Sequence, residues 1–535
     1  MVSDGPAGAM TETLGWASVL GDRGGYGNAA RNFVRGLRDA GSPPALAQIG
    51  PTDPDIGERD QQLLRDLADE ELAGVDTMVA HVPPPMLVDL VPRLRAVQGA
   101  PVAACTIAET DRLSVEWAVA CNLADEVWVP TTFNLLTFAA SGVDPYKLRL
   151  VPYGIDAEAW DPHGPVNRSV APDDHFVFLY TFQFDWRKGF DLLLSSYLQE
   201  FTRADPVTLV LKIFEPPGAV RSIRARLAEA ILDCVDLLSE NLPRVVIIDA
   251  ALERDALAAL HRRADLYIST DRANGWGMPC MEQMAMGKAA ACIDWSGSTE
   301  FMRADNALLI PAHVPLVPVD ARLQRERPDY RGQRWGDVRE ADVRAVMRAA
   351  FVGEVDLARL GAAARAEILE CWSLADSARG IAGRNTGAYT PAPGLAARLR
   401  PMVGLSEHGV YANCHPKMLA CDAAHVSDAD LAQTLSAYAT AFAADTPVTL
   451  VLAGDPAQIT DRVLMALQAI GVDPDDIADA VVGAEIADVL ADPRLVGLIG
   501  AGRWPDGLTT ACVPEPQALR AALDRPAPPV FAPLP

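Results

Sequence analysis

Short apolar runs alternate with longer amphipathic stretches along most of the chain. The runs have the length of buried strands and lie at residues 16–20, 78–82, 102–107, 126–129, 148–151, 176–182, 207–213, 245–248, 264–270 and 289–293. The stretches between them have helical periodicity; in residues 28–40, for instance, Ala29, Phe33 and Leu37 fall on one face. This alternation predicts an α/β protein whose parallel sheets are covered on both faces. Ligands of such sheets bind beyond the carboxyl ends of the strands.

A glycine turn separates the strand at 264–270 from a helix expected at 280–286. Gly275 and Gly277 lie in this turn, just before the helix begins. Free N–H groups and the positive end of the helix dipole make such a turn a site for anions. Glu282 is in the first turn of the helix, where its carboxylate can accept two hydrogen bonds from a ribose or a hexose.

A second glycine loop, residues 21–27, joins the first strand to the helix at 28–40. Strand, glycine loop and helix again form a layout that binds phosphate, with Gly25 and Gly27 closest to the helix. The order of the glycines differs from the dinucleotide fingerprint, so the loop does not predict an NAD site. Taken alone, it also fits a plain tight turn.

Polar residues follow two of the predicted strands in the first part of the chain. His81 ends the strand at 78–82, and Glu109 and Asp111 follow the strand at 102–107. A lone histidine after a strand is more often structural than catalytic. Glu109 is the better candidate, because a carboxylate beside the cleft can orient an acceptor hydroxyl or help to take its proton.

Two cations follow the strand at 176–182. Arg187 and Lys188 stand directly before Gly189, at the start of another helix. A guanidinium can bind two phosphate oxygens at once, so this loop predicts a phosphate site. The alternative is that both side chains are solvated loop charges.

The composition narrows the function classes. The 535 residues suffice for about two to four domains, and the formal net charge of −25 disfavours nucleic acid or anionic membrane as a partner. A local basic patch is still conceivable at Arg31, Arg35, Arg38, Arg187 and Lys188. Nine cysteines without a C-x-x-C pair predict a reducing cytoplasm, not a disulfide scaffold or a zinc site. We expect neither a signal peptide nor a membrane span.

Residues 275–287 resemble a known motif. They match G-[FW]-G-x-P-x-x-E-x-M-A-x-G, the donor-site signature of retaining, family-4-like GT-B glycosyltransferases. Residues 124–130, 151–156 and 187–191 resemble the aDevWvPs strand, the vPyGvD link and the R-K-G-x-D loop of that family. The resemblance covers the first two predicted domains. It implies the GT-B fold, in which two Rossmann-like domains enclose an active-site cleft.

The resemblance also implies roles for single residues. Lys188 is expected to bind the donor diphosphate, and Arg187 to replace an arginine that the family places at Gln183. The family has a further glutamate eight residues before the one matched by Glu282; here that residue is Asn274, expected to face the transferred sugar. The implied donor-binding residues are Gly25, Gly27, Arg187, Lys188, Gly277, Met278, Pro279, Glu282, Ser298 and Thr299.

Glu109 and Asn274 are the catalytic candidates. No metal is expected, because protein cations and helix N-termini can stabilise the leaving diphosphate, and no suitable loop contains D-x-D. Glu300 follows Ser298 in a segment that resembles the family's G-x-x-E, but it also fits an ordinary carboxylate in a first helical turn. Residues 311–340, rich in proline and arginine, are expected to form a surface insertion.

We predict a Rossmann-like acceptor-side domain at 10–165, a nucleotide-sugar domain at 166–385, a linker at 386–394 and a degenerate α/β domain at 395–535. Residues 194–211 align without a gap with 435–452, while Ala429 takes the place of Lys188. The copy would serve packing, oligomer contacts or acceptor recognition. A chance match of two amphipathic units is the alternative.

The sequence thus predicts a cytoplasmic glycosyltransferase. It would move a sugar from a UDP- or GDP-linked donor to an unknown glycan, lipid or protein acceptor, with retention implied by the resemblance. One alternative is a sugar-nucleotide-binding or scaffold protein whose transferase site is degenerate, since Glu is missing at 274 and Arg at 183. Epimerisation of a sugar nucleotide is another, which the motif at 275–287 disfavours.

Overall fold

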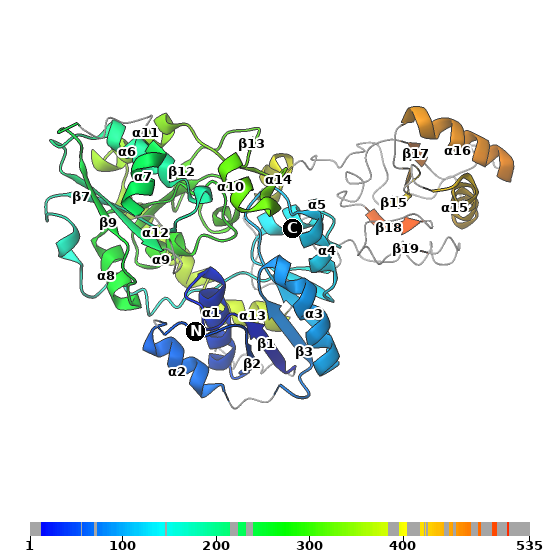
Figure 1. Ribbon diagram of the computed structural model, residues 1–535, viewed down its shortest axis with the longest axis horizontal. Coiled ribbons are helices and arrows are strands. Elements are labelled where there is room, and N and C mark those ends of the chain that lie inside the picture. Colours follow the sequence, from blue (N-terminus) through cyan, green and yellow to red (C-terminus); the bar gives the residue numbers. More distant parts are fainter. Residues whose placement is uncertain are drawn as a thin grey trace, which may run out of the picture.

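The computed structural model describes residues 12–383, except 55, 69–71, 145–146, 215–222 and 232–238, and parts of the chain between 395 and 512. The described parts after 395 are 395–403, 418–421, 423, 426–442, 449–452, 456–471, 480–482, 495–499 and 511–512. Three parallel sheets, each flanked by helices, follow one another along the chain (Figure 1). The predicted α/β class is confirmed.

The first sheet has six strands in the order β2-β1-β3-β4-β5-β6. Its strands are β1 (Leu14–Ser18), β2 (Ala45–Gln48), β3 (Thr77–His81), β4 (Val102–Cys105), β5 (Glu126–Val129) and β6 (Leu148–Leu150). Its helices are α1 (Gly25–Asp39), α2 (Glu58–Asp66), α3 (Pro84–Gln98), α4 (Val115–Asn122) and α5 (Thr132–Ala140). Every residue of β1, β3 and β4 is buried, as expected for strands covered on both faces.

The second sheet also has six strands, in the order β12-β11-β10-β7-β8-β9. They are β7 (Phe176–Gln183), β8 (Val207–Phe214), β9 (Arg244–Ile248), β10 (Leu266–Ile268), β11 (Ala289–Ile293) and β12 (Leu308–Ile310). The surrounding helices are α6 (Phe190–Glu200), α7 (Ile223–Ile231), α8 (Arg254–Arg263), α9 (Met278–Ala285), α11 (Glu340–Phe351) and α12 (Leu357–Cys371). Residues of both sheets share one large hydrophobic core, so the two halves are packed together.

The chain returns to the first half after α12. Ser373 forms a bridge with Ile155, and Trp372 packs against Trp276 with ring centroids 5.3 Å apart. Helix α13 (Leu374–Gly383) then packs on α1, where a Cβ on Gly36 would lie 2.5 Å from the carbonyl oxygen of Leu374. The chain therefore crosses back to the first half at residues 372–373, and only glycine at position 36 allows so close an approach.

Residues 311–340 are folded and partly buried. They form β13 (Val317–Pro318), α10 (Ala321–Glu326), a 3-10 turn (Pro328–Tyr330) and β14 (Arg334–Trp335). Tyr330 and Trp335 are each only 2% exposed. The prediction of a plain surface insertion is therefore wrong for its inner face, because the long-range contacts that bury these aromatic rings have no local sequence pattern.

The third sheet has five strands in the order β17-β16-β15-β18-β19. They are β15 (Met418–Cys421), β16 (Thr449–Leu452), β17 (Ala480–Val482), β18 (Leu495–Ile499) and β19 (Ala511–Cys512), with helices α14 (Leu395–Met402), α15 (Asp428–Ala441) and α16 (Pro456–Ile470). The predicted linker at 386–394 lies outside the described residues. Across the described part of the chain, no helix combines the length and apolarity needed to cross a bilayer.

Candidate active site between the two six-stranded sheets

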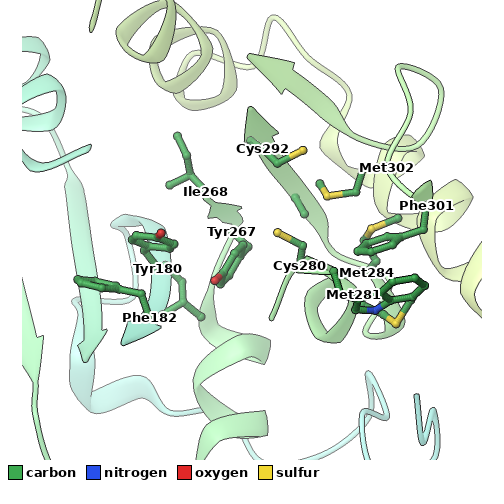
Figure 2. Close-up of a cluster of buried hydrophobic side chains, with 14 of the residues drawn as sticks. Tyr180, Phe182, Tyr267, Ile268, Cys280, Met281, Met284, Cys292, Phe301 and Met302 are labelled. Carbon is green, nitrogen blue, oxygen red and sulfur yellow. The ribbon is translucent and has the colours of Figure 1, made fainter. Parts of the chain in front are cut away.

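The glycine turn before α9 is fixed by backbone geometry and by a buried core. Gly277 has φ +96°, a left-handed conformation that favours glycine, and Pro279 occupies the first helical turn, where its missing N–H costs nothing. Figure 2 shows Cys280, Met281 and Met284 of α9 within a cluster of buried side chains. Because these three residues are at most 2% exposed, their packing in the core fixes the position of the helix N-terminus.

Glu282 is buried on α9 beside a buried histidine. Burial raises the pKa of Glu282 from 4.5 to about 8, and burial lowers the pKa of His261 from 6.5 to about 4. Their closest approach is 3.9 Å between Oε2 and Nε2, and we interpret it as a contact between neutral groups at pH 7 rather than an ion pair. A neutral carboxyl can both donate to and accept from the hydroxyls of a ribose.

Asn274 is engaged with the neighbouring loop. Its Oδ1 accepts a hydrogen bond of 2.9 Å from the amide of Ser298, its carbonyl accepts 2.9 Å from the amide of Gly297, and its Nδ2 lies 3.4 Å from Ser298 Oγ. The residue is 5% exposed. The structure thus places Asn274 as a clamp between the two predicted donor loops.

The segment 297–300 has used most of its donors inside the protein. The amide of Thr299 donates to Ser296 O at 3.2 Å, and the amide of Ser298 is taken by Asn274. Glu300 is 1% exposed and accepts 2.7 Å from the amide and 3.0 Å from the hydroxyl of Thr132. It therefore caps α5 of the first half, which the sequence alone could not distinguish from a cap of its own helix.

Arg187 and Lys188 lie on a short 3-10 turn that Asp185 caps through the amide of Arg187. Lys188 Nζ is 2.8 Å from Asp271 Oδ2, and Arg187 Nη1 donates 2.7 Å to the carbonyl of Ala273. Gly189 ends the turn with φ +58° and passes so close to the carbonyl of Thr270 that a Cβ would lie 2.2 Å from it. The two cations are consequently fixed against the strand end that leads into the Gly275–Gly277 turn.

The first glycine loop contains one open and one packed glycine. A Cβ on Gly25 would meet no atom within 4 Å, whereas a Cβ on Gly27 would lie 2.1 Å from the carbonyl of Asp22. Tyr26 between them donates to or accepts from Thr106 Oγ1 at 3.1 Å, beside the end of β4. The room for a ligand is therefore at Gly25, while Gly27 is required by the loop itself.

Glu109 brings the first half into the site. Its Oε1 is 3.5 Å from Arg187 Nη2, and its Oε2 accepts a hydrogen bond of 3.2 Å from Tyr330. Asp111 instead binds the backbone and side chain of Arg334, at 2.6 and 3.0 Å. His81 is fully buried among aromatic rings, where burial lowers its pKa to about 3, so it is structural.

Of the three arginines considered as a basic patch on α1, only Arg38 has a side chain more than a third exposed, 37%, and it is paired with Asp39 at 2.8 Å. Arg31 and Arg35 are 4% and 2% exposed and bind Asp60 at 3.0 and 2.7 Å. Arg254 of α8 reaches the same carboxylate at 3.1 Å. The cluster joins α1 and α2 to the second half and is not open to an acidic partner; the helical face carrying these arginines is the one turned inward.

A known structure is similar in fold to this chain. HepE from Anabaena, crystallised with UDP and glucose, superposes with a TM-score of 0.51 at 15% identity, over 70% of this chain and 100% of HepE. The chain has the GT-B fold. A glycosyltransferase from Rickettsia africae gives a TM-score of 0.47 at 12% identity, over 70% and 100% of the two chains. No protein family and no curated protein matches the sequence.

Three residues of the candidate site were not predicted from the sequence. Asp271 pairs with Lys188, Tyr330 binds Glu109, and Arg254 lies close enough to Glu282 to favour its charged form. Asp271 carried a usable signal, because it directly follows the strand that leads into the glycine turn. Tyr330 comes from a segment 221 residues away from Glu109, and Arg254 comes from the preceding helix, α8; only the folded structure places either of them in the site.

Proposed function

We propose that this protein is a glycosyltransferase that uses a nucleoside-diphosphate sugar, UDP- or GDP-linked, and transfers the sugar with retention and without a metal. The acceptor is a glycan, a lipid or a protein. Six cysteines in the described part of the chain are free, which supports action in the reducing cytoplasm.

The observation that carries the proposal is the meeting of Arg187 and Glu109. The second half supplies paired cations at the carboxyl end of β7, and the first half supplies a carboxylate from the carboxyl end of β4. Parallel sheets place ligands at these ends. A diphosphate-linked donor fits the cations, and an acceptor hydroxyl fits the opposing carboxylate.

Each residue then has a defined role. Lys188 and Arg187 neutralise the departing diphosphate, and the N-terminus of α9 adds its dipole, so that charge is stabilised without a metal ion. Glu282 holds the ribose, with the raised pKa that lets it donate as well as accept. Glu109 orients the acceptor hydroxyl and takes its proton. Gly25 leaves room for the donor beside the first loop.

A thermal-shift panel of sugar nucleotides and free nucleotides, with donor hydrolysis read in the same wells, tests the proposal. A ligand present at a hundred times its Kd should stabilise the protein by about 2.7 kcal/mol. We expect one nucleotide to stabilise the wild type, its sugar form to be slowly hydrolysed, and Lys188→Ala to lose both. The absence of any shift, with wild type and Lys188→Ala alike, would exclude the donor site.

A binding protein without transferase activity is the second candidate, and Asn274 favours it. Its side-chain oxygen is occupied by the amide of Ser298, and it lacks the charge of the glutamate that the resembled family has there. Replacing Asn274 by Glu separates the candidates. The variant raises donor turnover if the site is merely weakened, and it changes nothing if the protein only binds.

A further inference from the structure

Glu109 is shared between a cation and a phenol inside the proposed donor site. Arg187 Nη2 lies 3.5 Å from one carboxylate oxygen, and Tyr330 Oη donates to the other at 3.2 Å. The two charged side chains are 12% and 20% exposed, so water screens their attraction only in part. The carboxylate thus has two partners, of which one is the arginine assigned to the donor diphosphate.

Tyr330 is held firmly by the 311–340 segment. Its ring lies T-shaped to Trp117 with centroids 6.4 Å apart, and the guanidinium of Arg327 is 5.1 Å from its centroid. It belongs to a small buried cluster with Ala273, Val319, Leu323 and Trp335. Burial, and next the carboxylate of Glu109, raise the pKa of Tyr330, so the hydroxyl keeps its proton and donates.

The Glu109–Arg187 pair is not needed to hold the two halves together. Glu300 caps α5 across the same boundary, and Arg334 binds Asp111 across it as well. Arg187 is itself anchored through Nη1 to Ala273, and its Nε is buried without a hydrogen-bond partner among the described residues. Two of its three nitrogens, Nε and Nη2, are therefore available to an anion that carries more charge than a single carboxylate.

We propose that Glu109 occupies Arg187 in place of the donor diphosphate, and that Tyr330 is the positioning residue that retains Glu109 when the diphosphate takes the arginine. This inference rests on the proposed function. A diphosphate presents more charge and matches the guanidinium fork, so it displaces the carboxylate. Glu109 then keeps the Tyr330 hydrogen bond and becomes available to an acceptor hydroxyl only after the donor has bound.

The competition of Glu109 with the diphosphate and the holding of Glu109 by Tyr330 predict opposite effects on nucleotide binding for two conservative variants. Glu109→Gln removes the competing charge, so nucleotide binding should become about three- to tenfold tighter. Tyr330→Phe leaves the displaced carboxylate without a partner, so binding should become about three- to tenfold weaker. A role of Tyr330 in packing alone predicts no such weakening, because phenylalanine keeps the ring.

Titration calorimetry of the full-length chain with UDP, GDP and inorganic pyrophosphate measures both effects. Glu116→Gln is the control for charge, since Glu116 is exposed on α4 of the same half. Tyr197→Phe is the control for a lost buried hydroxyl, since Tyr197 donates to Arg244 O at 2.9 Å, away from Glu109. Both controls should bind like the wild type.

The outcomes separate this inference from the proposed function. If neither the wild type nor Glu109→Gln binds any of the three ligands, the proposed function fails and the inference with it. If the wild type binds and Glu109→Gln binds equally or more weakly, the function stands and the competition is refuted. Unchanged binding by Tyr330→Phe refutes its positioning role. Should that variant not fold, Glu109→Asp, which shortens the side chain away from both partners, must still tighten binding, and failure to do so refutes the inference.

Discussion

The second six-stranded sheet and the C-terminal sheet are built alike, yet among the described residues the candidate site lies at the second six-stranded sheet and not at the C-terminal one. Numbered within each unit, their strands follow the same spatial order, 3-2-1-4-5, with a sixth strand added in the former. The gapless sequence alignment pairs Tyr197 with Tyr438 and Phe201 with Phe442. In both units these two rings pack together, with centroids 5.4 and 5.1 Å apart. The scaffold is repeated down to a ring pair.

The difference lies in how the first helix of each unit begins. In the second half of the chain's two-sheet part, a 3-10 turn with Gly189 at φ +58° presents Lys188 before α6 starts at Phe190. In the C-terminal unit, Ser427 caps α15 directly, and Ala429 lies inside the helix. Without the glycine turn, no side chain at this position is presented as Lys188 is. Scaffold and site are therefore separable, and the predictions below test them separately.

The largest expected effects concern the shared scaffold. Tyr197→Ala and Tyr438→Ala each remove a fully buried ring, so each should destabilise its own unit by about 3–5 kcal/mol. Chemical denaturation, monitored by hydrogen exchange, would assign each loss of stability to its unit. If Tyr438→Ala had little effect, the C-terminal unit would not be a packed copy of the second half.

The next effect belongs to the site alone. Because the folded-state pKa of Glu282 is raised to about 8, its contribution to stability is present at low pH and is lost as pH rises. His261, whose pKa falls from 6.5 to about 4, opposes this below pH 6.5. Between pH 6.5 and 8, stability should thus fall by up to about 1.4 kcal/mol per pH unit, and Glu282→Gln should remove this slope. Urea denaturation at a series of pH values measures it, and an unchanged slope in the variant would contradict the assignment.

A lysine at the aligned position, residue 188 or residue 429, should support nucleotide binding only in the unit that contains Lys188. Lys188→Ala removes a charge-assisted contact to phosphate and should weaken nucleotide binding about ten- to thirtyfold. The reciprocal Ala429→Lys adds the charge to an exposed helical position and should create no nucleotide binding in a Lys188→Ala background. Calorimetry with UDP and GDP distinguishes the two, and rescue by Ala429→Lys would show that the C-terminal unit retains a latent site.

The smallest effect concerns a contact that joins α14, the helix before the C-terminal sheet, to the second half. Arg398 pairs with Asp294, with side chains 40% and 29% exposed. Such exposed pairs contribute about 0–1 kcal/mol. Arg398→Ala should therefore leave nucleotide affinity unchanged and shift the melting temperature only slightly. A large change in affinity would mean that the C-terminal part takes a direct role in the donor site.

Periodicity was sufficient to predict most of the scaffold. The strands at 126–129 and 289–293 have the predicted bounds, because each is a single apolar run between clear breaks. Helix α1 begins at Gly25 rather than at residue 28, since the glycines of the loop join its first turn. The strand predicted at 264–270 is shorter, 266–268. The residues after Ile268 leave the sheet and contact the loop that carries Arg187 and Lys188.

The site was predictable as a set of loops and not as a set of contacts. Local motifs pointed to Lys188 and Glu282, whereas the partners of Arg187 and Asn274 depend on which loops the folded chain brings together. Tyr330 and Glu109 are separated by 221 residues, and the Tyr330 segment gave no local sign that it would be buried. Likewise, Arg31 and Arg35 look like surface charges in the sequence, but in the folded chain both bind the carboxylate of Asp60, as Arg254 does.

A crystal structure of the full-length protein with UDP would test the central claim most directly. The account predicts a diphosphate bound by Arg187 and Lys188, a ribose on Glu282, and Glu109 separated from Arg187 but still bonded to Tyr330. A nucleotide bound elsewhere, for instance on the C-terminal sheet, or a diphosphate that leaves the Glu109–Arg187 pair intact, would contradict it.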